Sequence, residues 1–331
     1  MSEAIVPLSS IDAAEIRERV RAAGVVGAGG AGFPTHIKLQ ARVDTVLVNA
    51  AECEPMLKVD QQLMAQQADR LIRGLGYAMT ATGAQEGIIA LKAKYAPAIA
   101  ALTPRLPEWA RLHILPDVYP AGDEVLTIWL ATGRRVPPAA LPVSVGVVVN
   151  NVQTVLNIAR AVEQGYPVTR RTLTVNGAVA RPLTLAVPLG ISLREVLDLA
   201  GGATVDDPGF INGGPMMGRA MVNLDSPVTK GCSGITVMSG RDAQRREATQ
   251  CIKCAKCVSA CPMGLEPYYL SKMTQKKGWD ELEALMITSC IECGCCQSTC
   301  PAYLPLLDWV RLGKQTVMGL IRARAAAAPK K

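Results

Sequence analysis

Eight of the eleven cysteines fall in two runs that share one spacing, C-x2-C-x2-C-x3-C-P. This spacing is typical of chains that bind two [4Fe–4S] clusters through thiolates. The first three cysteines of a run wrap one cluster, and the fourth, next to the proline, reaches the other. We therefore predict one cluster on Cys251, Cys254, Cys257 and Cys300, and a second on Cys290, Cys293, Cys296 and Cys261.

Zinc and disulfide bonds are the other common uses of clustered cysteines. Zinc sites usually pair two C-x2-C knuckles, without a third closely spaced cysteine and a distant fourth. Disulfides belong to secreted chains, and this chain opens without a basic segment followed by an apolar one. The spacing favours clusters over both. Cys295 is an extra thiol inside the second run, where Cys296 keeps the spacing.

The composition limits the broad class. The 331 residues are enough for two or three domains, and with 49% hydrophobic residues but 2 Phe the cores should be aliphatic. No uninterrupted apolar run approaches the roughly 18 residues that a membrane span needs, so we expect no direct membrane insertion and a cytoplasmic location. The net charge of +7 comes without interleaved aromatic residues, so we do not expect nucleic acid as a partner.

A glycine-rich segment, residues 26–35, follows a predicted amphipathic helix over 11–23. Gly27, Gly29 and Gly32 match G-x-G-x-x-G, but the dinucleotide-binding form of this motif needs a strand before it. We therefore do not predict an ordinary Rossmann loop here. Backbone N–H groups of the glycines can still approach a phosphate or a planar ring closely, and a plain tight turn is the alternative.

Three predicted strands end in polar residues. Strands alternate with helices over residues 40–165, which favours a parallel α/β sheet, and such sheets bind ligands at the carboxyl ends of their strands. The strands at 45–50, 111–115 and 145–149 lead, in turn, into Asn49, Glu52 and Glu54, into Tyr119, Asp123 and Glu124, and into Asn150, Asn151 and Thr154. Together these groups predict one crevice, although helix capping alone would explain Asp123 and Glu124.

Residues 169–240 have the pattern of a small α+β unit. We predict a hairpin turn at Asn176–Gly177 and a helix that begins with a capping box at Ser192–Glu195. A loop rich in glycine and methionine, residues 213–218, is conspicuous within this unit. Its simplest interpretation is a turn.

Three further segments read as helical. We expect one long helix over 61–81, capped by Asp60, with its apolar face in the core. Residues 241–312 read as helices around the cysteine runs. Residues 313–331 read as a basic helical tail that frays.

Four segments, in order, resemble the FMN- and NADH-binding segments of the flavin subunit of respiratory complex I: residues 27–35, 49–55, 119–124 and 150–154. With the order of its domains, the chain resembles a family that comprises PduS-type cobalamin reductases of propanediol-utilisation microcompartments and the RnfC-type subunits of Rnf electron-transport complexes. The resemblance implies an α/β, Rossmann-type domain like that of the complex I flavin subunit at 1–168, a β-grasp domain of the SLBB type at 169–240, a helical ferredoxin-like domain with two [4Fe–4S] clusters at 241–312, and a basic tail at 313–331.

The resemblance also implies the cofactor sites. FMN would be held by the glycine-rich loop and the strand ends, through Gly27, Gly29, Gly30, Lys38, Asn49, Glu52, Tyr119, Gly122, Asp123, Glu124, Asn150, Asn151 and Thr154. NADH would stack over the flavin near Phe33, Glu54 and Glu124. The chain departs from complex I in two places, with Ala28 in place of an arginine and Ala51 in place of an acid.

The implied activity is that of an NADH-dependent flavoprotein reductase. NADH gives two electrons as a hydride, a [4Fe–4S] cluster accepts one at a time, and a flavin connects the two, without an amino-acid nucleophile. We expect electrons to pass to a corrinoid or another low-potential acceptor in a bacterial microcompartment. The expected partner is a corrinoid-dependent enzyme, an adenosyltransferase or a shell protein. The alternatives are a subunit of an Rnf-type membrane redox pump and a non-catalytic iron–sulfur relay protein.

Overall fold

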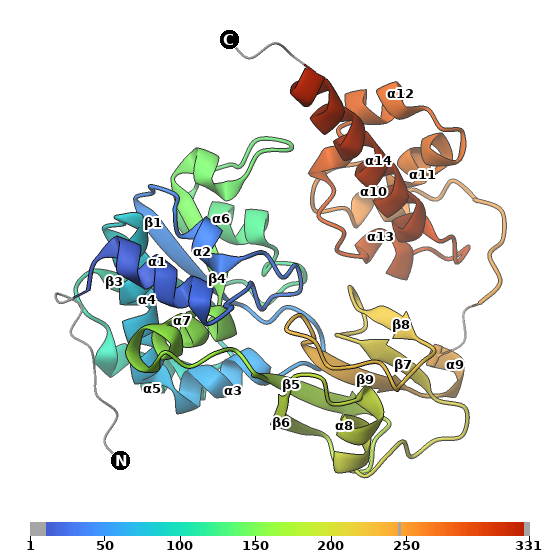
Figure 1. Ribbon diagram of the computed structural model, residues 1–331. Helices are drawn as coiled ribbons and strands as arrows, with labels where there is room; N and C mark the ends of the chain where they lie inside the picture. The colour runs from blue at the N-terminus through green and yellow to red at the C-terminus, as the bar shows by residue number, and fades with distance from the viewer. Residues whose placement is uncertain (1–10, 244–245, 328–331) are drawn as a thin grey trace. The chain divides into compact units, whose positions relative to one another are not determined.

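The computed structural model describes residues 11–243 and 246–327, and the chain divides into two compact units. The first consists of Met1–Val136 with Leu141–Ala243, and the second of Pro137–Ala140 with Gln244–Lys331. The first unit holds two sheets, and the second is built from helices (Figure 1). Within the described ranges, no helix combines the length and the apolar character needed to cross a membrane.

A parallel four-stranded sheet, in the order β3-β2-β1-β4, forms the centre of residues 11–168, which we call the flavin-type domain (Figure 1). The strands are β1 (Thr45–Ala50), β2 (Glu86–Lys92), β3 (Ala110–Leu115) and β4 (Val147–Asn151). On one face, Val46 and Val48 share a core with α1 (Ala13–Ala22), α4 (Ala68–Thr82) and α7 (Val152–Gln164). On the other face, Leu47 packs with Ile128 of α6 (Glu124–Thr132). Both faces are covered, as parallel sheets require, and the predicted α/β architecture is confirmed.

The single helix expected over 61–81 is wrong. The chain forms α3 (Val59–Gln66) and then α4, and Gln67 between them leaves the helical region with φ −129° and ψ 37°. This break lets α3 pack against α5 (Ala96–Leu102) while α4 packs against α7. Asp60 is not the cap, because it lies buried in the first turn of α3.

The β-grasp domain has a mixed five-stranded sheet in the order β6-β5-β9-β7-β8. Its strands are β5 (Arg170–Gly177), β6 (Leu183–Pro188), β7 (Gly209–Asn212), β8 (Arg219–Met221) and β9 (Gly234–Met238). The capping box is confirmed: Glu195 N donates to Ser192 Oγ (3.1 Å), and Ser192 N donates to Glu195 Oε2 (3.0 Å). It begins α8 (Leu193–Leu199), which packs on the sheet through Val196 and Leu197.

The hairpin between β5 and β6 exists, but its predicted turn at Asn176–Gly177 is wrong. Both residues belong to β5 and pair with β9, and the loop to β6 covers residues 178–182. The Asn176 amide donates to Met56 O (3.0 Å), a contact with the flavin-type domain. Gly177 has φ +84°, and a Cβ there would lie 2.0 Å from Val237 O. Tertiary contacts therefore place these two residues in a strand, although the local sequence favours a turn.

The second unit packs its helices around Leu270, Leu282 and Val310. The helices are α10 (Lys256–Ser259), α11 (Pro267–Gln275), α12 (Trp279–Ala284), α13 (Cys295–Ser298) and α14 (Leu306–Ala327). The last helix runs without a break through residue 313, where we expected the tail to begin. Gly313 and Val317 are buried, and a Cβ on Gly313 would lie 2.3 Å from Thr274 Oγ1.

Several short elements complete the described chain. They are α2 (Thr35–Lys38), α9 (Gly240–Ala243) and the 3-10 turns Thr103–Arg105, Pro142–Val145 and Ile287–Ser289.

Candidate functional site

The glycine-rich loop, residues 27–33, is closed at its base by a hydrogen bond from Gly27 N to Phe33 O (2.8 Å). Gly30 and Gly32 have φ of +112° and +65°, a region that favours glycine. A Cβ on either residue would meet no atom within 4 Å, so the backbone here has open space beside it. Phe33 is 47% exposed. The loop can therefore present its amides to a ligand.

Two buried side chains hold this loop from opposite sides. The Thr154 hydroxyl, on α7, accepts from Ala28 N (2.9 Å). Arg171, on β5, donates to Ala28 O (2.7 Å) and to Cys232 O (2.6 Å). Thr154 is fully buried and positions the loop. Arg171 was not predicted from the sequence, because it comes from the β-grasp domain, to which we assigned no part in the site.

Predicted residues meet at the carboxyl end of β4. The Lys38 ammonium donates to Val149 O (2.8 Å) and lies 3.4 Å from Glu124 Oε1. Asn150 is 4% exposed, and its Nδ2 has no hydrogen-bond partner among the described residues. A buried amide donor without a partner is costly, so Asn150 indicates a ligand that accepts from it.

The end of β1 contacts the loop before α6 directly. Asn49 Nδ2 donates to Gly122 O (2.7 Å). A Cβ on Gly122 would lie 2.7 Å from Ala51 Cβ and 2.9 Å from Cys53 Sγ, so only glycine fits this contact without movement. Tyr119, on the same loop, is partly buried.

Asp123 caps α6. Its Oδ1 accepts from Val125 N (2.9 Å) and Leu126 N (3.2 Å), so the capping explanation weighed for this residue describes its contacts. The side chain of Glu124, the first residue of α6, is 42% exposed and points to Lys38.

The partly buried Glu52 and the buried Asp60 form an acidic pair at the first turn of α3. Glu52 accepts from Asp60 N (2.9 Å) and Gln61 N (3.3 Å), so it stabilises the first turn of α3. Burial, with a further contribution from Asp60, raises the pKa of Glu52 to about 7. Burial also raises the pKa of Asp60 to about 6, against the effects of Arg171 and of Asn151, which donates to Asp60 Oδ2 (2.6 Å).

Glu54 binds the glycine- and methionine-rich loop, residues 213–218. Its carboxylate accepts from Met216 N (3.1 Å) and Met217 N (2.5 Å). Burial raises the pKa of Glu54, and these two N–H groups lower it. Gly214 packs so closely that a Cβ there would lie 2.2 Å from Glu54 Oε2. Glu54 thus joins the two domains of the first unit.

The groups of the glycine-rich loop and of the strand ends fit FMN by their chemistry. Loop amides, the Lys38 ammonium and the unpartnered Asn150 amide are donors suited to a phosphate and to ring carbonyls. The side chains of Glu52, Asp123 and Thr154 are engaged with protein groups, so their ligand roles stay predictions.

The two cysteine runs share one backbone. Positive φ recurs at the same three places in each, at Lys253, Ala255 and Gly264 and at Glu292, Gly294 and Tyr303. A short helix follows in each run, α10 in the first and α13 in the second. Positive φ is uncommon outside glycine, so its repetition shows that both runs adopt one specific loop fold.

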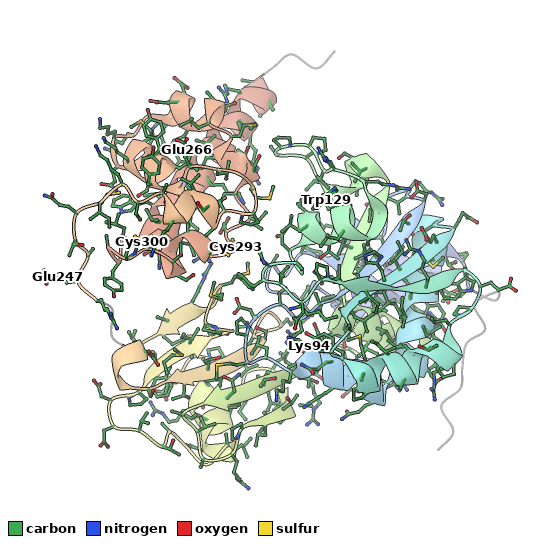
Figure 2. The ribbon with its side chains drawn as sticks, turned by 180° about the vertical axis from the view of Figure 1, so that it is seen from behind. Lys94, Trp129, Glu247, Glu266, Cys293 and Cys300 are labelled. Atoms are coloured by element: carbon green, nitrogen blue, oxygen red, sulfur yellow. The ribbon has the colours of Figure 1, made fainter. Side chains whose placement is uncertain are left out.

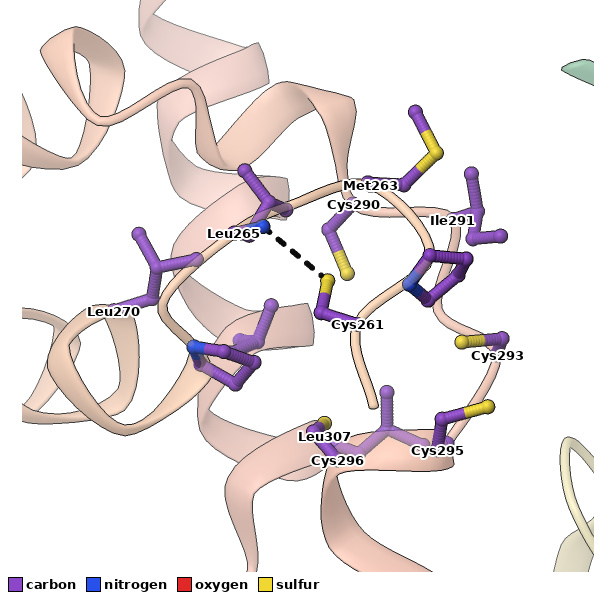
Figure 3. Close-up of a pocket in the computed structure, with 14 residues that line it drawn as sticks. Cys261, Met263, Leu265, Leu270, Cys290, Ile291, Cys293, Cys295, Cys296 and Leu307 are labelled. Atoms are coloured by element: carbon purple, nitrogen blue, oxygen red, sulfur yellow. Dashed lines mark hydrogen bonds between the residues drawn. The ribbon is translucent and has the colours of Figure 1, made fainter. Parts of the chain in front are cut away.

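One predicted set of cysteines surrounds a cavity. Cys290, Cys293 and Cys296 of the second run line it together with Cys261 of the first, amid apolar side chains such as Leu270 (Figure 3). Burial raises the pKa of Cys290 to about 11 and that of Cys296 to about 12. A metal centre would supply the positive charge that such partly buried thiolates need. The donor set and the crossed arrangement fit a [4Fe–4S] cluster.

The other predicted set is more open. Cys251 and Cys254 are exposed, whereas Cys257 is buried. Burial raises the pKa of Cys257, and Cys300 of the second run is among the neighbours that raise it further. Cys293 and Cys300, labelled in Figure 2, thus face different sets although they belong to one run. In the described part of the chain, no three His, Cys, Asp or Glu side chains are grouped to hold a single metal ion.

Two cations near the enclosed set were not predicted. Lys314 donates to Cys290 O (2.7 Å) and pairs with Glu292 (3.0 Å), and Arg311 pairs with the same carboxylate (3.2 Å). Their spacing of three residues places both on one face of α14. The spacing of the two cations can be read from the sequence. Their shared pairing with Glu292 cannot, because it depends on the tertiary fold.

Three domain families match the chain in order. They are the Nuo51 FMN-binding domain at residues 20–160, the SLBB domain at 172–220 and the 4Fe-4S dicluster domain at 243–301. The chain also resembles a crystal structure of an NAD+-reducing [NiFe]-hydrogenase in the H2-reduced state, with a TM-score of 0.63 and 21% identity. That match covers 100% of this chain and 69% of the other, and it supports the fold.

Curated relatives are more similar. Cobalamin reductase PduS of Citrobacter freundii is 73% identical over 272 residues, which cover 78% of this chain and 60% of that protein. The RnfC-like component of the Na(+)-translocating ferredoxin:NAD(+) oxidoreductase complex of Acetobacterium woodii is 40% identical over 284 residues, covering 84% and 64%. The chain thus spans less than two thirds of the length of these relatives. Over the matched residues, the chain is similar to PduS cobalamin reductases and to their RnfC-like homologues, and residues 20–160 match the Nuo51 FMN-binding domain.

Proposed function

We propose that this chain is an electron-transfer oxidoreductase that takes electrons from NADH and passes them through FMN and two [4Fe–4S] clusters to a corrinoid. Another low-potential acceptor would be served by the same chemistry. One observation carries the proposal: a single chain combines a buried amide without a hydrogen-bond partner among the described residues, at Asn150, with two crossed sets of cysteines. FMN, when bound, accepts two electrons together and releases them singly, which matches NADH to one-electron clusters.

The residues of the crevice would bind and orient the flavin. Amides of Gly27, Gly29 and Gly30 and the Lys38 ammonium would hold its anionic and carbonyl groups, and Asn150 would donate to it. The remaining predicted residues would shape the walls of the flavin site. They are Asn49, Glu52, Tyr119, Gly122, Asp123, Glu124, Asn151 and Thr154.

NADH would bind over the flavin beside Phe33, which is half exposed on the loop. Glu124 lies beside Lys38 and could accept from a ribose hydroxyl. Glu54 is already bound to the amides of Met216 and Met217, so we propose that it sets the wall of this crevice.

The test is cofactor content followed by an anaerobic titration. Protein reconstituted with FMN, iron and sulfide should bind about one flavin and about eight irons. NADH should then bleach the flavin and reduce the clusters, and addition of a cob(III)alamin should reoxidise them. Clusters without flavin would identify a relay protein instead. Loss of flavin, clusters and NADH oxidation together would overturn the proposal.

We also propose the partner and the location of the chain from its similarity to PduS. A corrinoid-dependent enzyme, an adenosyltransferase or a microcompartment shell protein would be the partner, in the cytoplasm and within a bacterial microcompartment. The 40% identity to a component of an ion-translocating complex favours one alternative, a subunit of a membrane redox complex. Affinity purification from the source cell separates the two, because shell proteins or integral membrane proteins would accompany the chain.

A further inference from the structure

The long helix α14 brings a cation to the enclosed set of cysteines. This set consists of Cys261, Cys290, Cys293 and Cys296. Leu307 and Val310 of α14 line the cavity between these thiols (Figure 3). Lys314 follows Val310 by four residues and Leu307 by seven, a spacing that places all three on one face of the helix. Its side chain is only 24% exposed, so its charge lies on the cavity side of α14.

Lys314 holds the turn at the start of the second cysteine run. Its ammonium donates to Cys290 O (2.7 Å) and pairs with Glu292 Oε1 (3.0 Å). Arg311, one turn earlier on the helix, pairs with Oε2 of the same carboxylate (3.2 Å). The helix therefore grips both a predicted ligand residue and the residue two positions after it.

The residue gripped in this way points an amide at a predicted ligand. Glu292 N donates to Cys290 Sγ (3.4 Å). Glu292 has φ +57°, a backbone region that residues other than glycine seldom adopt. Hydrogen bonds to the ligand sulfurs and nearby charges are two of the factors that set the reduction potential of an iron–sulfur cluster. Lys314 contributes to both, because it carries a charge and it fixes the backbone that donates to the sulfur.

The first cysteine run has the opposite charge at the matching position. Lys253 has φ +56°, nearly the value at Glu292, but its side chain is exposed. A lysine cannot accept from two cations as the Glu292 carboxylate does. The contact with α14 therefore distinguishes the two runs, although their loops share one backbone conformation.

We infer that Lys314 is a positioning residue for the enclosed set, whose charge stabilises the cluster there and raises its reduction potential. Addition of one electron makes a cluster more negative by one charge, and a cation beside a partly buried ligand stabilises that state. The inference rests on the proposed function, because it requires that the enclosed set holds a cluster.

The test is an anaerobic redox titration of the full chain, loaded with FMN and iron and followed by electron paramagnetic resonance. Lys314→Gln keeps a donor but removes the charge. It should shift the equilibrium of one cluster about tenfold towards the oxidised form, which lowers that midpoint potential by about 59 mV. Lys314→Arg keeps the charge and should retain the original potential. Arg324→Gln is the matched control, since Arg324 pairs with Glu283 about 15 Å further along the same helix.

The variant Cys261→Ser identifies the cluster concerned, because it should remove the enclosed one. In that background, Lys314→Gln should leave the remaining potential unchanged. If Lys314→Gln instead loses about four of about eight irons while Lys314→Arg keeps them all, the charge is needed to hold the cluster, which also supports the inference.

Three results would overturn the inference. They are an unchanged potential and iron content in Lys314→Gln, an equal shift in Lys314→Arg or Arg324→Gln, and a shift that persists in the Cys261→Ser background. Failure of the proposed function looks different, because the unsubstituted protein would then bind no clusters and both ideas would fall. Normal clusters with unmoved potentials would remove the role of Lys314 alone.

Discussion

The two predicted cofactor sites differ in how the chain builds them. One is the pair of cysteine runs in the second compact unit, which we call the cluster unit, and the other is the predicted flavin site in the first unit. In the cluster unit, ligands and loop conformation repeat within two short runs, so residues close in sequence make most of each site. In the crevice, the glycine-rich loop is held by Thr154 and Arg171, residues more than a hundred positions away. In a site built from one short segment, the loss of a single ligand should abolish cofactor binding. In a site built by tertiary contacts, each single substitution should weaken binding only in part.

The sharpest contrast concerns a single ligand. Replacing Cys261 by serine should remove the enclosed cluster, because this residue is its only ligand from the first run in the crossed assignment. Iron should fall from about eight to about four per chain, measured by iron assay and by the spectrum of the reduced protein. Cys295→Ala is the control, since Cys295 lies in the same cavity outside the predicted set and should leave iron unchanged. The reverse result for the two variants would move the ligand from Cys261 to Cys295.

The same contrast explains what the sequence could predict. Spacing alone predicted the two cysteine sets, one of which lines a cavity, and strand–helix alternation predicted the parallel sheet that the structure shows. Local sequence patterns did not predict the helix break at Gln67 or the hydrogen bond from Asn176 to Met56. Both follow from packing between segments that are far apart in the chain. Arg171 was missed for the same reason: a lone arginine in a strand has no local signal for the loop that it holds.

At the predicted flavin site, substitution of Gly122 should have the largest effect on stability and on flavin content. Gly122→Ala would place a methyl group 2.7 Å from Ala51 Cβ and 2.9 Å from Cys53 Sγ, which forces two backbone segments apart. We expect a loss of about 1–3 kcal/mol in the free energy of unfolding of the first unit, together with reduced flavin content. Chemical unfolding followed by tryptophan fluorescence measures the first. Gly133→Ala is the comparison, with open space for a Cβ but φ +74°, so it carries backbone strain without the clash. Equal flavin content in both variants would contradict the steric argument.

Asn150→Ala should separate binding from stability. The Asn150 Nδ2 group has no protein partner among the described residues, so removing it should weaken FMN binding by about tenfold and leave the apoprotein nearly as stable. Asn49→Ala should differ, since Asn49 donates to Gly122 O (2.7 Å), and its loss should lower stability as well as affinity. Flavin fluorescence titration and thermal unfolding of the apoprotein measure the two quantities. Unchanged FMN affinity in Asn150→Ala would remove Asn150 from the flavin site.

The last effect is a pH dependence of the free energy of unfolding. Glu52 has its pKa raised to about 7 from an ordinary 4.5, and Asp60 to about 6 from 3.8, chiefly by burial. The unfolded chain therefore releases these protons at lower pH than the folded chain. The stability associated with the raised values is fully present below about pH 4 and is lost as the pH rises to about 7.

Glu52→Gln should flatten this loss by an amount on the order of 2 kcal/mol between pH 5 and pH 8, because the amide does not ionise. Urea unfolding of the first unit across this range gives the slope. Glu86→Gln, which removes an exposed carboxylate paired with Arg111 (2.7 Å), is the control and should leave the slope as it is. Parallel curves for the unsubstituted protein and Glu52→Gln would show that the pair of Glu52 and Asp60 does not govern this pH dependence. They would also leave capping of α3 as the only demonstrated role of Glu52, because the hydrogen bonds to Asp60 N and Gln61 N need an acceptor but no particular charge.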